Sequence, residues 1–256
     1  MIRVAKIGGR AQADPGLATI LREAWDDSPG KLCVVHGGGD EVSAMQRALG
    51  REAVFVGGRR VTSEEDLELL RMVLSGVVNK RLVNTLVTAG LPAVGVSGED
   101  AGLIGAELID ARSLGFAGRP ISVKADFLHV LLNAFYLPVI SPVGYNASSP
   151  TGGALNVNGD DAAAAIAVAL EADELLLIAD VEGVLGAEGE TVSNLSIETA
   201  RELIANRIAV GGMAAKLESA EAALAAGIAR VRICDLTGLN DPERGTFITQ
   251  SQSVAL

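Results

Sequence analysis

Three glycine-bearing segments contain the residue types that phosphate chemistry requires. Two of them, Lys6–Gly9 (KIGG) and His36–Gly39 (HGGG), follow apolar runs typical of strands, and Gly211–Lys216 (GGMAAK) precedes an alanine-rich stretch typical of a helix. Glycine after a strand lets backbone N–H groups approach anionic oxygens, and a helix N-terminus adds a favourable dipole. Lys6 and Lys216 would place two positive charges on one phosphoryl group. Together the segments predict a small-molecule kinase.

The triple-glycine segment is the most informative of the three, because three glycines between a strand and a helix cost considerable folding entropy. A tight turn needs fewer, so we interpret Gly37–Gly39 as a run of N–H donors for a carboxylate or a phosphate. His36 is expected to be structural or orienting rather than a base. The chain contains no GxxxxGK[ST] motif and no GxGxxG motif after a strand, which argues against a Walker-type ATPase and a dinucleotide oxidoreductase.

Two charged pairs follow, and each has a structural and a functional interpretation. Arg59 and Arg60 precede a predicted helix; we expect Arg59 to be a surface charge and Arg60 to bind a substrate carboxylate in a bidentate pair. Asp160 and Asp161 stand before an alanine-rich helix, where either would cap the helix or one of the two carboxylates would organise the two lysines. Lys216 is expected in the first turn of its helix, where it opposes the dipole and requires a nearby anion.

The elements that position these residues alternate between strand-like and helical patterns. Strands are predicted at Ile2–Ile7, Leu32–Val35, Ala53–Val61 with a break at Gly57-Gly58, Ala93–Val96, Leu137–Ser141, Glu174–Ile178, Val231–Cys234 and Thr246–Ile248, with a hairpin over Gly102–Lys124. Helices are predicted from Asp14 and over Asp40–Leu49, Ser63–Ala89, Asp126–Asn133, Asp160–Leu170, Ser196–Asn206 and Met213–Ala226. The alternation predicts an α/β fold, a three-layer αβα sandwich around a mainly parallel open sheet.

Composition excludes several classes of function. The chain has 256 residues and a formal net charge of −11, and no lysine or arginine cluster offers a surface for nucleic acid. Cys33 and Cys234 lie in apolar runs, so we expect buried reduced thiols, and their spacing matches no zinc motif, so no metal site is expected. No signal sequence and no apolar run of membrane-spanning length occur, which predicts a cytoplasmic protein without membrane contact.

Eight segments, read together, resemble the amino acid kinase family and within it the acetylglutamate kinases. The segments keep the family's order and span nearly the whole chain: KIGG at Lys6–Gly9, HGGG at His36–Gly39, RVT at Arg60–Thr62, VNKRL at Val78–Leu82, VGVSGEDAGLI at Val94–Ile104, NVNGDDAAAAIA at Asn156–Ala167, ADVEGVL at Ala179–Leu185 and GGMAAK at Gly211–Lys216. Each is unspecific alone, but eight in register would be an improbable accident.

The resemblance implies an activity, a cofactor and a domain plan. The reaction is phosphorylation of the side-chain carboxylate of N-acetyl-L-glutamate by ATP, with Mg²⁺ carried by the nucleotide, in arginine biosynthesis. A carboxylate is already ionised at neutral pH, so no general base is needed, and positioning and charge stabilisation carry the catalysis. A single domain is expected, with an acyl-amino-acid-binding lobe at about residues 1–150, an ATP-binding lobe at about 151–256, and a seam near Ser141–Asn158.

The resemblance also implies roles for individual residues. Lys6 and Lys216 would stabilise the transferring phosphoryl group and Asp160 would hold both lysines. The residues expected to bind the acyl-amino acid are Gly38, Gly39, Arg60 and Asn156. The residues expected to bind ATP are Gly8, Gly9, Asp180, Val181, Glu182, Gly183, Val184, Leu185, Ile208, Ala209 and Val210.

Three departures from the family pattern and several alternatives stay open. Glu99 stands where many relatives carry lysine, Arg10 stands where a small or polar residue is commoner, and the N-terminal extension of arginine-inhibited hexamers is absent. We therefore expect an arginine-insensitive homodimer, paired through the long helix after Ser63. The alternatives are a kinase for N-succinylglutamate or carrier-linked aminoadipate, and a ligand sensor without turnover; the RVT and SGEDAGLI segments argue against UMP kinase and aspartate kinase.

Overall fold

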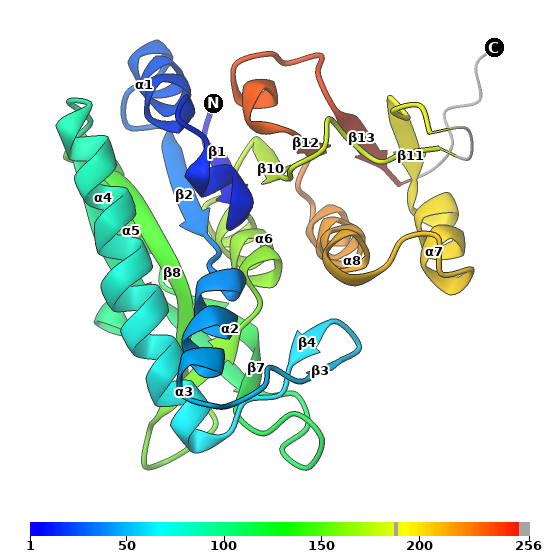
Figure 1. The fold of residues 1–256 in the computed structure, drawn as a ribbon. Coiled ribbons are helices and arrows are strands. Elements are labelled where there is room, and N and C mark those ends of the chain that lie inside the picture. Colours follow the sequence, from blue (N-terminus) through cyan, green and yellow to red (C-terminus); the bar gives the residue numbers. More distant parts are fainter. Residues whose placement is uncertain (187–188, 251–256) are drawn as a thin grey trace.

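Helices cover both faces of an eleven-stranded sheet in the computed structural model, which describes residues 1–186 and 189–250 (Figure 1). The strand order is β11 (Asn194–Ser196), β13 (Thr246–Thr249), β12 (Val231–Cys234), β10 (Glu174–Ile178), β1 (Arg3–Ile7), β2 (Leu32–His36), β8 (Leu137–Asn146), β6 (Ile104–Leu108), β7 (Ala117–Val123) and β9 (Ala154–Val157), with β5 (Ala93–Gly98) paired to β8. Its central strands are parallel, and the pairs β12–β13, β6–β7 and β8–β9 are antiparallel. The predicted fold class is confirmed.

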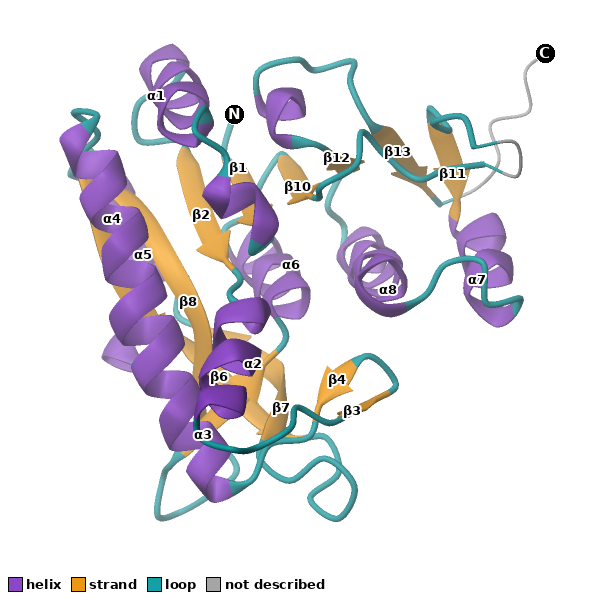
Figure 2. Cartoon of the chain, in the orientation of Figure 1, coloured by secondary structure: helices purple, strands orange, loops and turns teal. Residues whose placement is uncertain are grey.

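The central strands are buried on both faces, as their continuous apolar sequences require. In β2, Cys33 and Val35 enter the hydrophobic cluster on one face, and Leu32 and Val34 enter the cluster on the other, because successive side chains of a strand point in opposite directions. The first face is covered by α5 (Ala125–Asn133), α6 (Gly159–Ala169), α7 (Ile197–Ala205) and α8 (Gly211–Ala225), and the second by α1 (Leu17–Asp27) and α4 (Asn79–Thr88) (Figure 2). Both cysteines are buried and unpaired, as expected.

The carboxyl ends of three neighbouring parallel strands meet at one place. In the register of β1, Ile7 lies opposite His36 of β2 and Ile178 of β10. The segments that follow these strands therefore lie side by side at one edge of the sheet, where open α/β sheets bind their ligands. They contain Gly8-Gly9, Gly37–Gly39 and Asp180.

A small hairpin and a long helix stand beside this edge. The hairpin pairs β3 (Phe55–Val56) with β4 (Arg59–Arg60) and is separate from the main sheet. Its two-residue turn, Gly57-Gly58, has φ angles of +56° and +74°, which glycine adopts without strain in a hairpin turn. The helix runs as α3 (Glu64–Arg71), a π-helical segment (Met72–Val78) and α4.

The predicted start of the long helix is confirmed, because Ser63 and Asp66 form a reciprocal capping box. α2 (Gly39–Ala48) links the triple glycine to this region. Three short 3₁₀ segments complete the elements: Arg10–Ala13, Asp100–Gly102 and Leu236–Leu239.

Several predicted boundaries differ from the structure. The helix expected from Asp14 begins at Leu17, because the Asp14 carboxylate accepts a hydrogen bond from the Gly16 N–H and holds a turn before the helix. The predicted strand Leu137–Ser141 extends to Asn146 as β8, and β9 (Ala154–Val157) was not predicted. The strand β11 was not predicted. None of the helices in the described ranges is long and apolar enough to span a membrane.

Candidate active site

Asp160 lies at the start of α6 and contacts two lysine side chains. Asn158 caps this helix by accepting a hydrogen bond from the Asp160 N–H at 2.7 Å. Lys6 Nζ, at the end of β1, lies 3.1 Å from Asp160 Oδ1. Lys216 Nζ, on α8, donates to Oδ1 at 3.0 Å and to Oδ2 at 3.3 Å. Two cations from opposite ends of the chain therefore meet on one buried carboxylate.

Burial and charge compete in this cluster. Burial would raise the pKa of Asp160, but the charges of Lys6 and Lys216 outweigh it and hold the pKa below its usual range. Burial and the charge of Lys6 lower the pKa of Lys216 to about 8, although Asp160 opposes the change. Two cations and one anion leave an excess of positive charge, which an anionic phosphoryl group would compensate.

α8 begins at Gly211, two residues before the predicted start at Met213. Lys216 therefore lies in the second turn of the helix rather than the first. Its anion is Asp160, and the need for it comes from the burial of Lys216 rather than from the helix dipole expected to act in the first turn.

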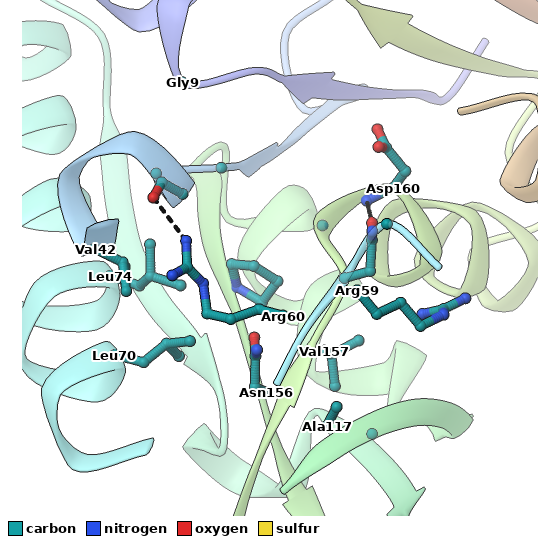
Figure 3. A pocket seen from close by; sticks show the side chains of 18 of the residues that line it. Gly9, Val42, Arg59, Arg60, Leu70, Leu74, Ala117, Asn156, Val157 and Asp160 are labelled. Atoms are coloured by element: carbon teal, nitrogen blue, oxygen red, sulfur yellow. Dashed lines mark hydrogen bonds between the residues drawn. The ribbon is translucent and has the colours of Figure 1, made fainter. Parts of the chain in front are cut away.

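A cavity of about 220 Å³ lies on the Lys6 side of Asp160 (Figure 3). Apolar side chains form much of its wall, with glycine backbone and two arginines at its rim. The residues that matter for binding are Lys6, Gly9, Gly38, Gly39, Arg59, Arg60, Asn156 and Asp160. The sequence-predicted acceptor residues Gly38, Gly39, Arg60 and Asn156 thus all line one cavity. Its mixture of apolar wall and few polar groups is typical of a small-molecule site.

Arg60 is held rigidly at this cavity although it lies on a short hairpin. Its guanidinium donates to Gly39 O and Ser43 Oγ, both at 2.8 Å, and to Gln46 Oε1 at 2.5 Å. It also lies over the Phe55 ring, 4.8 Å from the ring centroid. Only 8% of Arg60 is exposed, so the charge is fixed in place before any ligand arrives.

The polar group of Asn156 is also held in position. Asn156 Nδ2 donates to Thr62 Oγ1 at 2.9 Å, and Thr62 Oγ1 donates to the carbonyl of Arg60 at 3.0 Å. This chain of hydrogen bonds joins Asn156 of β9, through Thr62, to Arg60 of the hairpin. Sequence reasoning did not identify Thr62, Ser43 or Gln46, because nothing in the sequence pairs them with Arg60 and Asn156.

Within the triple-glycine segment, Gly38 has no room for a side chain. Gly38 has a φ of +155°, and a Cβ there would lie 2.6 Å from Leu74 Cδ2. The Gly37 N–H donates to Ile7 O at 2.9 Å, so the run of donors expected over Gly37–Gly39 does not include Gly37. The first N–H groups of α2 have no acceptor within the helix, which leaves them able to donate to an anion. His36 is buried beneath them: its Nδ1 donates to Gly37 O at 2.8 Å and its Nε2 accepts from Asn79 Nδ2 at 3.1 Å. Burial lowers the pKa of His36 to about 4, which keeps the ring neutral.

A second cavity of about 560 Å³ lies on the Lys216 side of Asp160. Four of the residues predicted to bind ATP line it, namely Gly8, Gly9, Asp180 and Val181. The two cavities share Gly9 and Gly39, so no side chain larger than glycine separates them there. The two cavities are therefore adjacent at these glycines.

The other residues predicted to bind ATP lie outside this cavity. Glu182 pairs with Arg244 at 2.7 Å, Gly183 packs against Thr246, and Val184 is buried, with its N–H donating to Thr246 Oγ1. These contacts anchor the loop after β10.

Leu185, Ile208 and Val210 are about half exposed or more, whereas Ala209 is buried. The exposed apolar side chains of Ile208 and Val210 lie just before α8, which begins at Gly211. Their contact with a nucleotide stays a prediction.

The comparison with known proteins settles the family. The family model described as the amino acid kinase family matches residues 1–235. The chain belongs to the amino acid kinase family. It is 41% identical over 237 residues to an acetylglutamate kinase of Ruegeria sp. (strain TM1040), covering 91% of this chain and 82% of the relative.

Two further relatives agree. An acetylglutamate kinase of Geobacillus sp. (strain WCH70) is 41% identical over 232 residues, covering 90% of this chain and 88% of the relative. The crystal structure of smu.665 from Streptococcus mutans UA159 superimposes with a TM-score of 0.86 at 31% identity, covering 98% of this chain and 99% of that one.

The structure corrects the expectation for Arg59 and shows the partners of Arg10 and Glu99, the two residues that depart from the family pattern of this amino acid kinase. The prediction that Arg59 is a surface charge is wrong, because Arg59 lines the first cavity and pairs with Asp161 at 2.6 Å. Arg10 reaches across the second cavity to Asp180 at 2.6 Å. Glu99 pairs with Arg71 at 3.1 Å, so its charge is balanced by a neighbour outside both cavities.

As an amino acid kinase, the chain uses ATP. Within residues 1–186 and 189–250, no group of three or more His, Cys, Asp or Glu side chains is arranged to hold a metal. Asp160 is occupied by both lysines. A metal carried by the nucleotide would therefore not find Asp160 free as a ligand.

Proposed function

We propose that this chain transfers the γ-phosphoryl group of MgATP to the side-chain carboxylate of N-acetyl-L-glutamate, a step of arginine biosynthesis. One observation carries the proposal: two cavities share Gly9 and Gly39, one is lined by Lys6 and the other by Lys216, and both lysines contact Asp160. The proposal also draws on the acetylglutamate kinases to which the chain is 41% identical.

The acceptor would bind in the smaller cavity. Arg60 would pair with the α-carboxylate, since a guanidinium offers two parallel donors that match a carboxylate. Asn156 would bind the acylated amine region, and the N–H groups at Gly38 and Gly39 would orient the reacting carboxylate. The apolar wall from Leu70, Leu74 and other side chains suits the methylene chain of the acceptor.

The nucleotide would bind in the larger cavity, with its phosphates near Gly8, Gly9 and the start of α8. Asp180 and Val181 would border the nucleoside, and Glu182–Leu185 with Ile208–Val210 would complete that side. Bound Mg²⁺ supplies charge neutralisation to the phosphates. Lys6 and Lys216 would donate to the oxygens of the transferring group, and Asp160 would keep the two cations from repelling each other before ATP binds.

The main chemical difficulty is the approach of two anions, and the site is built for it. A carboxylate nucleophile needs no deprotonation, so the absence of a poised base among the described cavity residues is no obstacle. His36 is neutral and its ring nitrogens are engaged by Gly37 and Asn79. Positioning and the excess positive charge of the cluster would supply the rate acceleration.

The decisive experiment is a hydroxamate assay with MgATP and four acceptors: N-acetylglutamate, N-succinylglutamate, glutamate and N-acetyl-aminoadipate. Hydroxylamine traps an acyl phosphate, so a signal establishes a carboxylate acceptor. We expect the highest kcat/KM with N-acetylglutamate. A better rate with another acceptor would reassign the substrate, and silence with all four beside intact ATP binding would favour a carrier-linked substrate or a sensor.

We also infer a cytoplasmic homodimer paired through the helix from α3 to α4. Met72 and Val77 on its π-helical segment are 62% and 54% exposed, and a second copy would cover them. Light scattering after size exclusion tests the mass, and Met72→Glu with Val77→Glu should yield monomers. A wild-type monomer would contradict the inference.

A further inference from the structure

The β3–β4 hairpin has little to hold it in place by itself. Each strand is only two residues long and neither pairs with the main sheet. Phe55 and Val56 are 53% and 49% exposed, so apolar packing contributes little. Isolated two-stranded hairpins are marginally stable in water. The hairpin nevertheless forms one wall of the acceptor cavity through Phe55, Gly58, Arg59 and Arg60.

Adjacent arginines attach the hairpin to opposite sides of the cavity. Neighbouring residues of a strand point in opposite directions, and Figure 3 shows Arg59 and Arg60 leaving the hairpin that way. Arg60 bonds to Gly39, Ser43 and Gln46 of α2. Arg59 Nη1 donates to Asp161 Oδ2 of α6 at 2.6 Å.

Asp161 is itself fixed by the helix that carries Lys216. Ser219 Oγ, on α8, donates to Asp161 Oδ1 at 2.8 Å. Ser219 follows Lys216 by three residues, so both side chains lie on the same face of α8, one turn apart. The pair Asp161–Ser219 therefore lies beside the pair Asp160–Lys216 and joins the same two helices. Only 27% of the Arg59 side chain and 17% of the Asp161 side chain are exposed.

We propose that Arg59 is a positioning residue, which closes the hairpin over the acceptor by bonding to the Asp161–Ser219 pair. This role rests on the proposed function. The Arg59 bond attaches the hairpin, which forms one wall of the acceptor cavity, to α6 and α8, the helices that carry Asp160 and Lys216. Without Arg59 the hairpin would keep its bonds to α2 and, through Thr62, to Asn156 of β9, but it would lose its bond to Asp161 of α6. Because acceptor binding requires the closed hairpin, the apparent affinity would fall with the closed fraction.

The kinetic test measures hydroxamate formation from N-acetylglutamate and MgATP for the wild type, Arg59→Ala and Arg59→Lys. In Arg59→Ala we expect the acceptor KM to rise roughly five- to tenfold, with kcat and the KM for ATP changed by less than about twofold. Arg59→Lys should recover part of the loss, since lysine keeps the charge but not the planar fork. The control is Arg201→Ala, which removes an ion pair to Glu221 on the same α8 outside both cavities and should match the wild type.

A double-mutant cycle tests whether Arg59 acts through Asp161. If it does, Arg59→Ala with Asp161→Ala should raise the acceptor KM no further than the more damaging single substitution. An acceptor KM within about twofold of wild type for Arg59→Ala, or single effects that multiply in the double variant, would overturn the proposal.

The rate of hydrogen exchange at the amides of residues 54–61 measures how firmly the hairpin is attached and does not depend on enzymatic turnover. We expect faster exchange in Arg59→Ala and unchanged exchange in Arg201→Ala. If the wild type is inactive but Arg59→Ala still exchanges faster than the wild type, the proposed function is rejected and the attachment through Arg59 is supported. Equal exchange in Arg59→Ala and wild type would reject the attachment whatever the activity.

Discussion

Lys6 and Lys216 contact the same carboxylate oxygen, Asp160 Oδ1, at 3.1 and 3.0 Å. Two ammonium groups this close repel each other strongly in a buried site, and one shared anion is what allows both to stay. The two lysines and Asp160 carry one net positive charge, and Lys6 lines one cavity while Lys216 lines the other. Removing either lysine should therefore affect catalysis far more than it affects folding.

Lys216→Ala should lower kcat by about 10²- to 10³-fold, because one charge that stabilises the transferring phosphoryl group is lost. The remaining cluster would be neutral overall, with Asp160 still paired to Lys6, so we expect a cooperative melt near that of the wild type. The hydroxamate assay and thermal unfolding by circular dichroism check both points. Lys124→Ala, a substitution of an exposed lysine, serves as the control, and near-wild-type turnover of Lys216→Ala would remove this residue from the mechanism.

The pH dependence should follow Lys216. With its pKa lowered to about 8, the side chain is protonated below that pH and loses its charge as the pH rises above it. The kcat/KM for ATP should therefore fall about tenfold per pH unit on the alkaline side, while kcat falls later because bound polyphosphate raises the pKa. Lys216→Arg stays protonated, so its lower rate should not show this decline. A wild-type kcat/KM that is flat to about pH 9.5 would contradict the assignment.

Arg60→Ala should raise the KM for N-acetylglutamate by roughly 10- to 100-fold, the usual loss for a charge-assisted bidentate pair. The KM for ATP should stay within about twofold, because Arg60 lies outside the nucleotide cavity. Steady-state kinetics with each substrate varied separates the two. Arg47→Ala, an exposed arginine on α2, is the matched control. An unchanged acceptor KM would show that Arg60 only supports the loop.

His36 predicts an acid limit to stability. Its folded pKa of about 4 lies below the unfolded value, so between about pH 6.5 and 4 the unfolded chain binds one more proton than the folded chain. The free energy of unfolding should then fall by about 1 kcal/mol per pH unit as the pH drops through this window. Urea unfolding of the wild type and of His36→Gln at several pH values measures this free energy. The variant should lack the part of the pH dependence that comes from His36. Parallel pH profiles for the two proteins would argue against a neutral buried ring.

Two of the buried central strands could be predicted from the sequence to the residue. Glu174–Ile178 and Val231–Cys234 match β10 and β12, because both strands are buried on two faces and end at polar or glycine-rich segments. β9 (Ala154–Val157) was missed, since it lies among Gly, Ser, Pro and Asn that favour loops and is held by pairing with β7 and β8. Tertiary pairing decided where local preference did not.

The candidate site could be predicted where motifs carry it and not where distant residues meet. The glycine segments and Lys6, Lys216 and Asp160 stand in recognisable patterns, and the structure brings them together. Arg59 carries no such signal, because its partner Asp161 is 102 positions away. The same holds for Ser43 and Gln46 against Arg60, whose pairing depends on how the hairpin packs on α2.

The central position of β1 dictates when this protein can assemble during synthesis. β1 emerges first from the ribosome, yet one of its two neighbours is β10 (Glu174–Ile178), which is translated much later. The first strand must therefore wait, with one edge unpaired, until most of the chain has been made, and such non-local pairing is slow and exposed to aggregation. Lys6 can meet Lys216 only after residue 216 has also been made, so a nascent chain that stalls earlier lacks the lysine pair on Asp160.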